Sequence, residues 1–296
     1  MIERVVTFGP RSTLVGILAE PDARKARPDA PAVLMWNVGV NHRIGPFRVY
    51  VDLARRLAED GFVALRFDSG GLGDSELRRE TVSDHQRAQL DVRDAMDVVT
   101  RRTGIRRFIL IGFCSSVDAA HAVAVDDARV VGVVHLEGYA FRTRGFRMRF
   151  PLRLLSKVRW KRYLQLQAAR FKPGQMRENL ERSAREDVYQ RDRPPWDKFT
   201  RDLEAMAARD VRFLFVYVGG DTSYNHAEQF WEMFPARGLR EKGEIEFYPD
   251  ADHTFFSVSV RQSVIERVCR FVRMRFGANQ PAGSFEASRV PAVTTR

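Results

Sequence analysis

Apolar runs alternate with amphipathic, helix-like segments along most of this 296-residue chain, and this alternation restricts the fold more than any other feature. Two β-rich runs separated by a turn open the chain and predict an antiparallel hairpin. Strands that then alternate with helices form a mostly parallel sheet with helices on both faces, so we predict an α/β fold. The expected strands are 3–8, 14–18, 32–38, 62–67, 107–113, 130–136, 211–218 and 244–248, and the expected helices are 46–60, 82–102, 115–126, 197–208, 224–234 and 258–276.

The sequence Gly-Phe-Cys-Ser-Ser at 112–116 stands where one expected strand passes into the next helix. A tight strand-to-helix turn exposes its central side chain, here Cys114, at a helix N-terminus, where free N–H groups favour negative charge. A thiol in that position ionises more readily, and the thiolate is the reactive form. We therefore expect Cys114 to be a nucleophile. Ser115 and Ser116 fall inside the first helical turn and are the weaker candidates.

A thiolate nucleophile needs a base and an acid that orients the base. His253 comes directly after the last expected strand, at the sheet edge where sites in such folds gather, so we predict it as the base. Asp221 follows the preceding strand across a Gly-Gly pair and is the predicted acid, with helix capping as its alternative role. Glu137, at the end of the strand before that, is the second candidate for the acid.

This order of nucleophile, acid and histidine, with the nucleophile on an elbow, resembles the α/β-hydrolase fold. Two further stretches look like loops of that family: RFDSGGLGDS at 66–75 is similar to the loop after its fourth strand, and DADHTF at 250–255 is similar to its histidine loop. The resemblance covers about 3–277 and implies a mostly parallel eight-stranded sheet with a helical cap insertion. The chain departs from the family pattern in having Cys114 in place of serine and Ser116 in place of a glycine.

Within the family, the chain looks most similar to the serine-aminopeptidase-like branch. The stretch NVGVNHRIGPFR at 37–48 resembles hydrolases associated with exosortase and surface-polysaccharide gene clusters. This stretch follows the third strand, where the family builds half of its oxyanion hole. The resemblance therefore implies an oxyanion hole made by the N–H groups of Ser115 and of Val40 or Gly39. It also implies a substrate-binding role for His42 and Arg43 at the mouth of the site.

The net charge of +11 has a local origin, because residues 142–193 hold sixteen Lys or Arg against five Asp or Glu. We expect 141–195 to form a basic helical cap inserted into a domain spanning 1–277, followed by a disordered tail at 278–296. The basic residues have three alternative roles. In the first, the apolar residues of the cap cover the active site and the long basic side chains extend past them to solvent. In the second they bind an acidic partner such as an acyl carrier protein, and in the third they contact an anionic membrane. No motif for nucleic-acid binding accompanies the charge.

No apolar run is long enough to span a bilayer, and no signal peptide is visible, so we expect a cytoplasmic location, either free or peripheral to the inner membrane. Of the two cysteines, Cys269 falls on the apolar side of a helix and is expected to be a buried thiol. We expect no disulfide, no cofactor and no metal ion.

The sequence thus predicts an enzyme that hydrolyses an ester or thioester through Cys114, His253 and Asp221, with an acyl-cysteine intermediate. A thiolate attacks activated esters and thioesters readily, which favours this chemistry over amide hydrolysis. Two alternatives remain open: an acyltransferase that passes the acyl group to an alcohol or amine, and a non-catalytic scaffold or binding protein.

Overall fold

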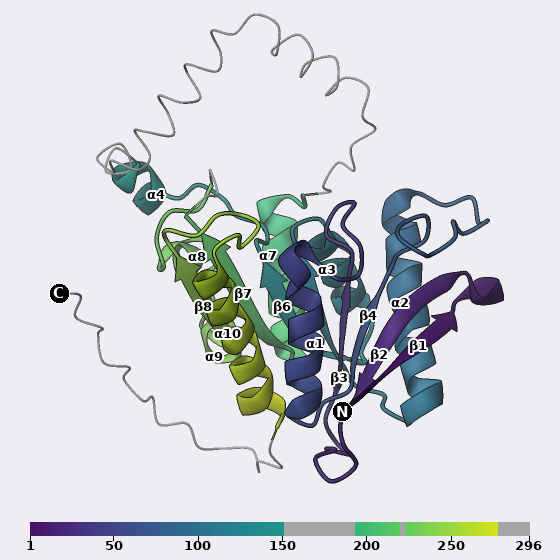
Figure 1. Ribbon diagram of the computed structural model, residues 1–296. Helices are drawn as coiled ribbons and strands as arrows, with labels where there is room; N and C mark the ends of the chain where they lie inside the picture. Colours follow the sequence, from purple (N-terminus) through teal and green to yellow (C-terminus); the bar gives the residue numbers. More distant parts are fainter. Residues whose placement is uncertain (151–192, 220–222, 278–296) are drawn as a thin grey trace, which may run out of the picture.

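The computed structural model describes residues 1–150, 193–219 and 223–277, which form one eight-stranded sheet covered by helices (Figure 1). The strand order is β1-β2-β4-β3-β5-β6-β7-β8. Only the pairs β1–β2 and β2–β4 are antiparallel; the remaining neighbours run parallel. The strands are β1 (Ile2–Phe8), β2 (Leu14–Glu20), β3 (Ala32–Trp36), β4 (Ala64–Phe67), β5 (Phe108–Phe113), β6 (Val130–Leu136), β7 (Arg212–Val218) and β8 (Gly243–Tyr248).

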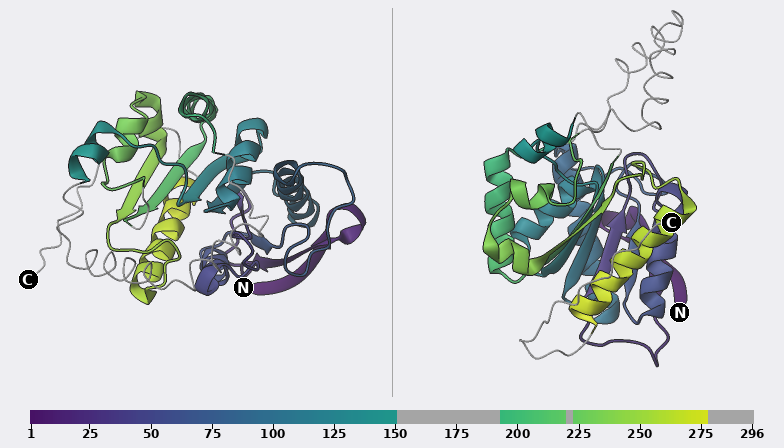
Figure 2. Two further views of the ribbon diagram at one scale, coloured as in Figure 1. Left: turned by 90° about the horizontal axis from the view of Figure 1, so that it is seen from above. Right: turned by 90° about the vertical axis from the view of Figure 1, so that its left-hand side faces the viewer.

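Helices cover both faces of the sheet, as the view from above makes plain (Figure 2). Helices α1 and α10 pack on one face, while α2, α3, α7, α8 and α9 lie on the other. Their bounds are α1 (Val49–Glu59), α2 (Asp84–Thr103), α3 (Ser116–Asp126), α4 (Arg144–Arg149), α7 (Trp196–Ala208), α8 (Gln229–Met233), α9 (Arg237–Lys242) and α10 (Val258–Phe276), with short 3-10 turns at Pro10–Ser12 and Pro46–Arg48.

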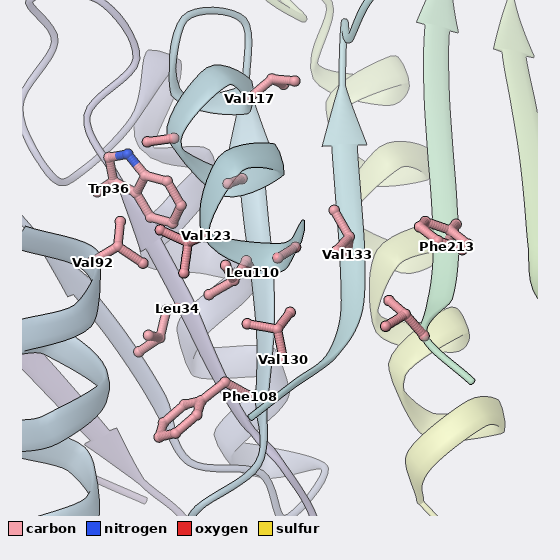
Figure 3. Close-up of a cluster of buried hydrophobic side chains, with 14 of the residues drawn as sticks. Leu34, Trp36, Val92, Phe108, Leu110, Val117, Val123, Val130, Val133 and Phe213 are labelled. Atoms are coloured by element: carbon pink, nitrogen blue, oxygen red, sulfur yellow. The ribbon is translucent and has the colours of Figure 1, made fainter. Parts of the chain in front are cut away.

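Each face of the sheet has its own hydrophobic core, which explains the almost unbroken apolar runs of the central strands. All six residues of β5 are buried. Alternate residues of this strand enter different cores: Leu110 packs with α2 and α3, whereas Ile109 and Ile111 pack with α1 and α10. Figure 3 shows the first of these cores, in which Trp36 lies with side chains from α2 and α3. The two cores hold the carboxyl ends of the parallel strands in fixed positions.

Most predicted elements are present within a few residues of the expected bounds, and two differ. The helix expected at 224–234 is reduced to α8, because Tyr224 stacks on Tyr217 with ring centroids 3.9 Å apart and the Asn225 side chain donates to the backbone of Phe146. These side-chain contacts keep the first residues out of a helical turn. The helix expected at 46–60 begins with a 3-10 turn, in which Phe47 has a φ of 48°.

Most of the predicted cap (151–192) and the predicted tail (278–296) lie outside the described residues. At the two ends of the cap, α4 and the segment leading into α7 are described. Among the helices that the structure describes, none combines the length and the apolar character needed to cross a membrane.

Candidate active site

Cys114 occupies a strained turn between β5 and α3, as the sequence predicts for an elbow. Its φ of 53° lies in the left-handed region, which costs a non-glycine residue about 1–3 kcal/mol. Gly112 makes the tight turn possible, because a Cβ there would lie 2.7 Å from the Cα of Val117. Ser116, at the position of the missing glycine, closes the turn instead: its Oγ accepts from the N–H of Phe113 (2.7 Å) and donates to the carbonyl of Phe113 (3.0 Å). The partly exposed thiol thus lies at the N-terminus of α3.

His253 and Glu137 complete a chain of interactions that begins at Cys114. The Nδ1–H of His253 donates to the Glu137 carboxylate over 3.1 Å, which leaves Nε2 for the hydrogen bond with Cys114. Glu137 is buried just after β6, and its other carboxylate oxygen accepts from the N–H of Val218 on β7 at 2.7 Å. This second hydrogen bond fixes the carboxylate, so the acid can hold the imidazole in one orientation.

The structure therefore pairs His253 with Glu137, the second candidate for the acid. Asp221, the first candidate, lies outside the described residues. Asp252, the sequence neighbour of His253, has a different role: its carboxylate accepts from the N–H groups of Thr254 and Phe256 and shapes the histidine loop.

The surroundings of His253 favour its protonated form. The hydrogen bond with Cys114 and then that with Glu137 raise its pKa from 6.5 to about 10, against the opposing effect of burial. At neutral pH, the imidazolium therefore lies next to the sulfur of Cys114. A positive neighbour and a helix N-terminus both favour the thiolate, so the arrangement suits an ion pair of thiolate and imidazolium.

The predicted oxyanion residues lie together beside Cys114, but their N–H groups differ. The N–H of Gly39 donates to the hydroxyl of Ser115 over 2.7 Å, and this bond ties the loop after β3 to the elbow. Within the described part of the chain, the N–H groups of Val40 and Ser115 make no hydrogen bond. These two amides are therefore available as donors at the end of a cavity wall that contains Cys114, as expected for an oxyanion hole.

His42 and Arg43, predicted to bind substrate, contact acidic side chains of the loop that follows β4 (residues 68–75, the β4 loop). The guanidinium of Arg43 pairs with the buried carboxylate of Asp68 and with Asp74, and His42 Nε2 lies 3.5 Å from Asp68. His42, Asp68 and Asp74 could together offer ligand atoms to a cation, but Arg43 already supplies the positive charge between the two carboxylates. We therefore assign this cluster a structural role in holding the loop.

A cavity of about 850 Å³ opens beside Cys114, between the first turns of α2 and α3. Cys114, Ser115, Gly39 and Val40 line one end of it. The rest of the wall comes from the loop after β4 and from α2. Sequence patterns do not connect these segments with the site, because their apolar residues follow ordinary helix and loop spacing. Neither His253 nor Glu137 is part of this wall.

Comparison with solved structures identifies the architecture. A hypothetical protein from Pseudomonas aeruginosa superposes with a TM-score of 0.58 at 19% identity, covering 93% of this chain and 94% of its own. An esterase from Pyrococcus furiosus gives 0.56 at 13% identity, covering 94% and 93%. A serine hydrolase from Xanthomonas campestris, described as having no lid, gives 0.54 at 15% identity, covering 94% and 97%.

The chain has the α/β-hydrolase fold. The elbow after β5 and the histidine loop after β8 are the places where this fold carries its nucleophile and its histidine. No family model matches the sequence, and neither does any curated protein.

Proposed function

We propose that this protein hydrolyses esters or thioesters, with Cys114 as the nucleophile, His253 as the acid and base, and Glu137 as the acid that orients His253. The observation that carries the proposal is the linked chain of three side chains at the elbow, in which one imidazole bonds to both Cys114 and Glu137. The esterases and hydrolases among the structural neighbours support the same class of reaction.

The geometry suggests a two-step mechanism. The sulfur of Cys114 attacks the carbonyl carbon, while the N–H groups of Ser115 and Val40 stabilise the developing oxyanion. The bond to the leaving group then breaks, and the His253 imidazolium gives its proton to the departing alkoxide or thiolate. In the second step, neutral His253 takes a proton from water, and the resulting hydroxide attacks the acyl-cysteine. This step releases the acid and restores the thiolate and the imidazolium.

The proposal favours esters and thioesters over amides. With an amide, the tetrahedral intermediate expels the Cys114 thiolate more easily than it expels the amine, so the attack is reversed. The same intermediate supports a second candidate, an acyltransferase, because the thioester at Cys114 retains a reactive carbonyl that an alcohol or amine can attack. For the basic segment at 142–193 we propose an acidic carrier protein or an anionic membrane as the partner. A cytoplasmic location of the protein is likewise a proposal.

Intact-protein mass spectrometry tests the nucleophile. The wild type is mixed with panels of acyl-coenzyme A and p-nitrophenyl esters, with Cys114→Ala and Cys114→Ser as controls. We expect an added acyl mass on the wild type that is absent from Cys114→Ala. Turnover by Cys114→Ala equal to that of the wild type would overturn the proposal. An acyl-enzyme that persists in water but discharges when an alcohol or amine is added favours transfer over hydrolysis.

A further inference from the structure

The cavity beside Cys114 is lined by Cys114 and Ser115, and neither His253 nor Glu137 belongs to its wall. In the tetrahedral intermediate, the oxygen points to the amides of Ser115 and Val40, and the leaving group lies near the imidazolium that protonates it. The acyl chain takes the remaining direction. Because the cavity wall contains Cys114 and Ser115 but not His253, the cavity is in the position for the acyl chain.

The wall of this cavity is largely apolar. Trp36 forms part of it from β3 and stacks on Phe67 with ring centroids 5.8 Å apart, inside the core shown in Figure 3. Leu72 from the β4 loop, Ala88 from α2 and Ala119 from α3 supply further apolar surface. The small side chains on the two helices are what leave the space between them open.

The charged residues of the wall are compensated within the protein. Asp84 forms an ion pair with Arg87 one turn along α2. The buried carboxylate of Asp91 accepts from Arg78 at 2.9 Å and from the N–H of Gly70 at 2.8 Å. Arg87 is paired with Asp84, and Arg78 is shared between Asp91 and Asp94, so the described wall offers no unpaired cation to a carboxylate at the end of a ligand.

We propose that this cavity binds an uncharged, apolar acyl chain of medium length, and that Ala88 sets the limit on chain length. The inference rests on the proposed function in taking Cys114 as the attacking group. A volume of about 850 Å³ lies within the range of small-molecule sites and is far larger than an acetyl group requires. An apolar chain in it displaces water from apolar surface, which is worth about fourfold in affinity for each added methylene.

The test uses alkyl methanethiosulfonates, which transfer an S-alkyl group to a thiolate and therefore probe the cavity without any hydrolysis. Cys269 is fully buried, so Cys114 is the cysteine that reacts. We expect the octyl reagent to modify Cys114 at least about tenfold faster than the methyl reagent, at concentrations below saturation. An ω-carboxylated reagent of equal length should react more slowly than the octyl one.

Two variants and a control locate the effect. Ala88→Phe fills the cavity and should lower the ratio of the octyl rate to the methyl rate to about one. Leu72→Ala widens the cavity and should extend the preference to a dodecyl reagent. Val258→Phe, at an exposed position outside the cavity wall, should leave the profile unchanged.

Equal methyl and octyl rates in the wild type would overturn the inference, and so would an octyl preference that survives in a folded Ala88→Phe. The same variants are then assayed with acetyl, butyryl, octanoyl and dodecanoyl thioesters. If none is hydrolysed although the labelling preference holds, the proposed function fails and the binding site stands. If all are hydrolysed at equal rates and labelling shows no preference, the enzyme stands and the binding site fails.

Discussion

Replacing Glu137 by glutamine tests which acid orients His253. The Glu137 carboxylate accepts two hydrogen bonds, from His253 Nδ1 and from the N–H of Val218. Glutamine has the same shape but only one oxygen. If that oxygen accepts from Val218, the amide NH₂ faces Nδ1, and the imidazole must carry its proton on Nε2, next to Cys114. If the amide is turned the other way, its NH₂ opposes the N–H of Val218.

The second orientation loses the buried hydrogen bond from Val218, at a cost of about 1–3 kcal/mol, and both orientations remove the charge that stabilises the imidazolium. The first orientation also imposes the wrong tautomer of the imidazole. Together these effects predict a fall in kcat/KM of about 100- to 10,000-fold. Because the hydrogen bond with Glu137 is one of the two that raise the pKa of His253, the alkaline limit set by this group should also move down from about pH 10.

The assay is kcat/KM for a p-nitrophenyl ester across pH, with Asp221→Asn as the matched control and thermal unfolding as a check on folding. We expect Asp221→Asn to keep activity within a few-fold of the wild type. The opposite pattern, an active Glu137→Gln beside an inactive Asp221→Asn, would show that Asp221 is the acid and that our interpretation of the Glu137 contact is mistaken.

Four further predictions concern the elbow and His253. Cys114→Ala removes the interaction that contributes most to the raised pKa of His253, so NMR titration should show this pKa falling from about 10 towards 6.5; an unchanged pKa would contradict the ion pair. Because folding raises the pKa of His253, its protonated form also adds to the free energy of unfolding of the wild type. This contribution is complete below pH 6.5 and is lost as the pH rises through about 10, which urea unfolding across pH should show. Ser115→Ala releases the N–H of Gly39 and should lower kcat by about threefold to tenfold with little change in KM, and a KM effect alone would argue against a role in the oxyanion loop. Gly112→Ala places a methyl group against the backbone of α3 and should cost about 1–3 kcal/mol in urea unfolding, whereas wild-type stability would mean that the turn relaxes.

The parts of the fold that depend on local pattern were predictable from the sequence. The final helix, α10, has the expected bounds, because its apolar residues recur at helical spacing over its whole length. The elbow was predictable as well, since a glycine and small polar residues between an apolar strand and a helix specify the turn. The helix expected at 224–234 was wrong over its first turn, because contacts with Tyr217 and Phe146 outweigh its local preference.

The candidate site was predictable where chain order determines position. Cys114 and His253 follow strands whose ends meet at one edge of the sheet, so their proximity follows from the fold. The choice between Glu137 and Asp221 did not follow, because both come after strands on the same side of β5. The pairing of Glu137 depends on the carboxylate reaching across to Val218 and His253, which is a three-dimensional fact. The cavity is equally invisible in sequence, because it results from small residues on helices that are separate in the chain.

The backbone strain at the elbow has a consequence for the newly made chain. Cys114 and Glu137 both hold left-handed backbone angles, with φ of 53° and 59°, and neither is a glycine. Each is held by a hydrogen bond to the next strand: the N–H of Cys114 donates to Leu136 and that of Glu137 to Val216, both at 2.9 Å. Until β5, β6 and β7 have paired, these two hydrogen bonds between strands are absent, and Glu137 and His253 are not held beside Cys114. The surroundings that favour the thiolate of Cys114 are therefore complete only after the sheet has formed, and a partly folded chain presents an ordinary thiol.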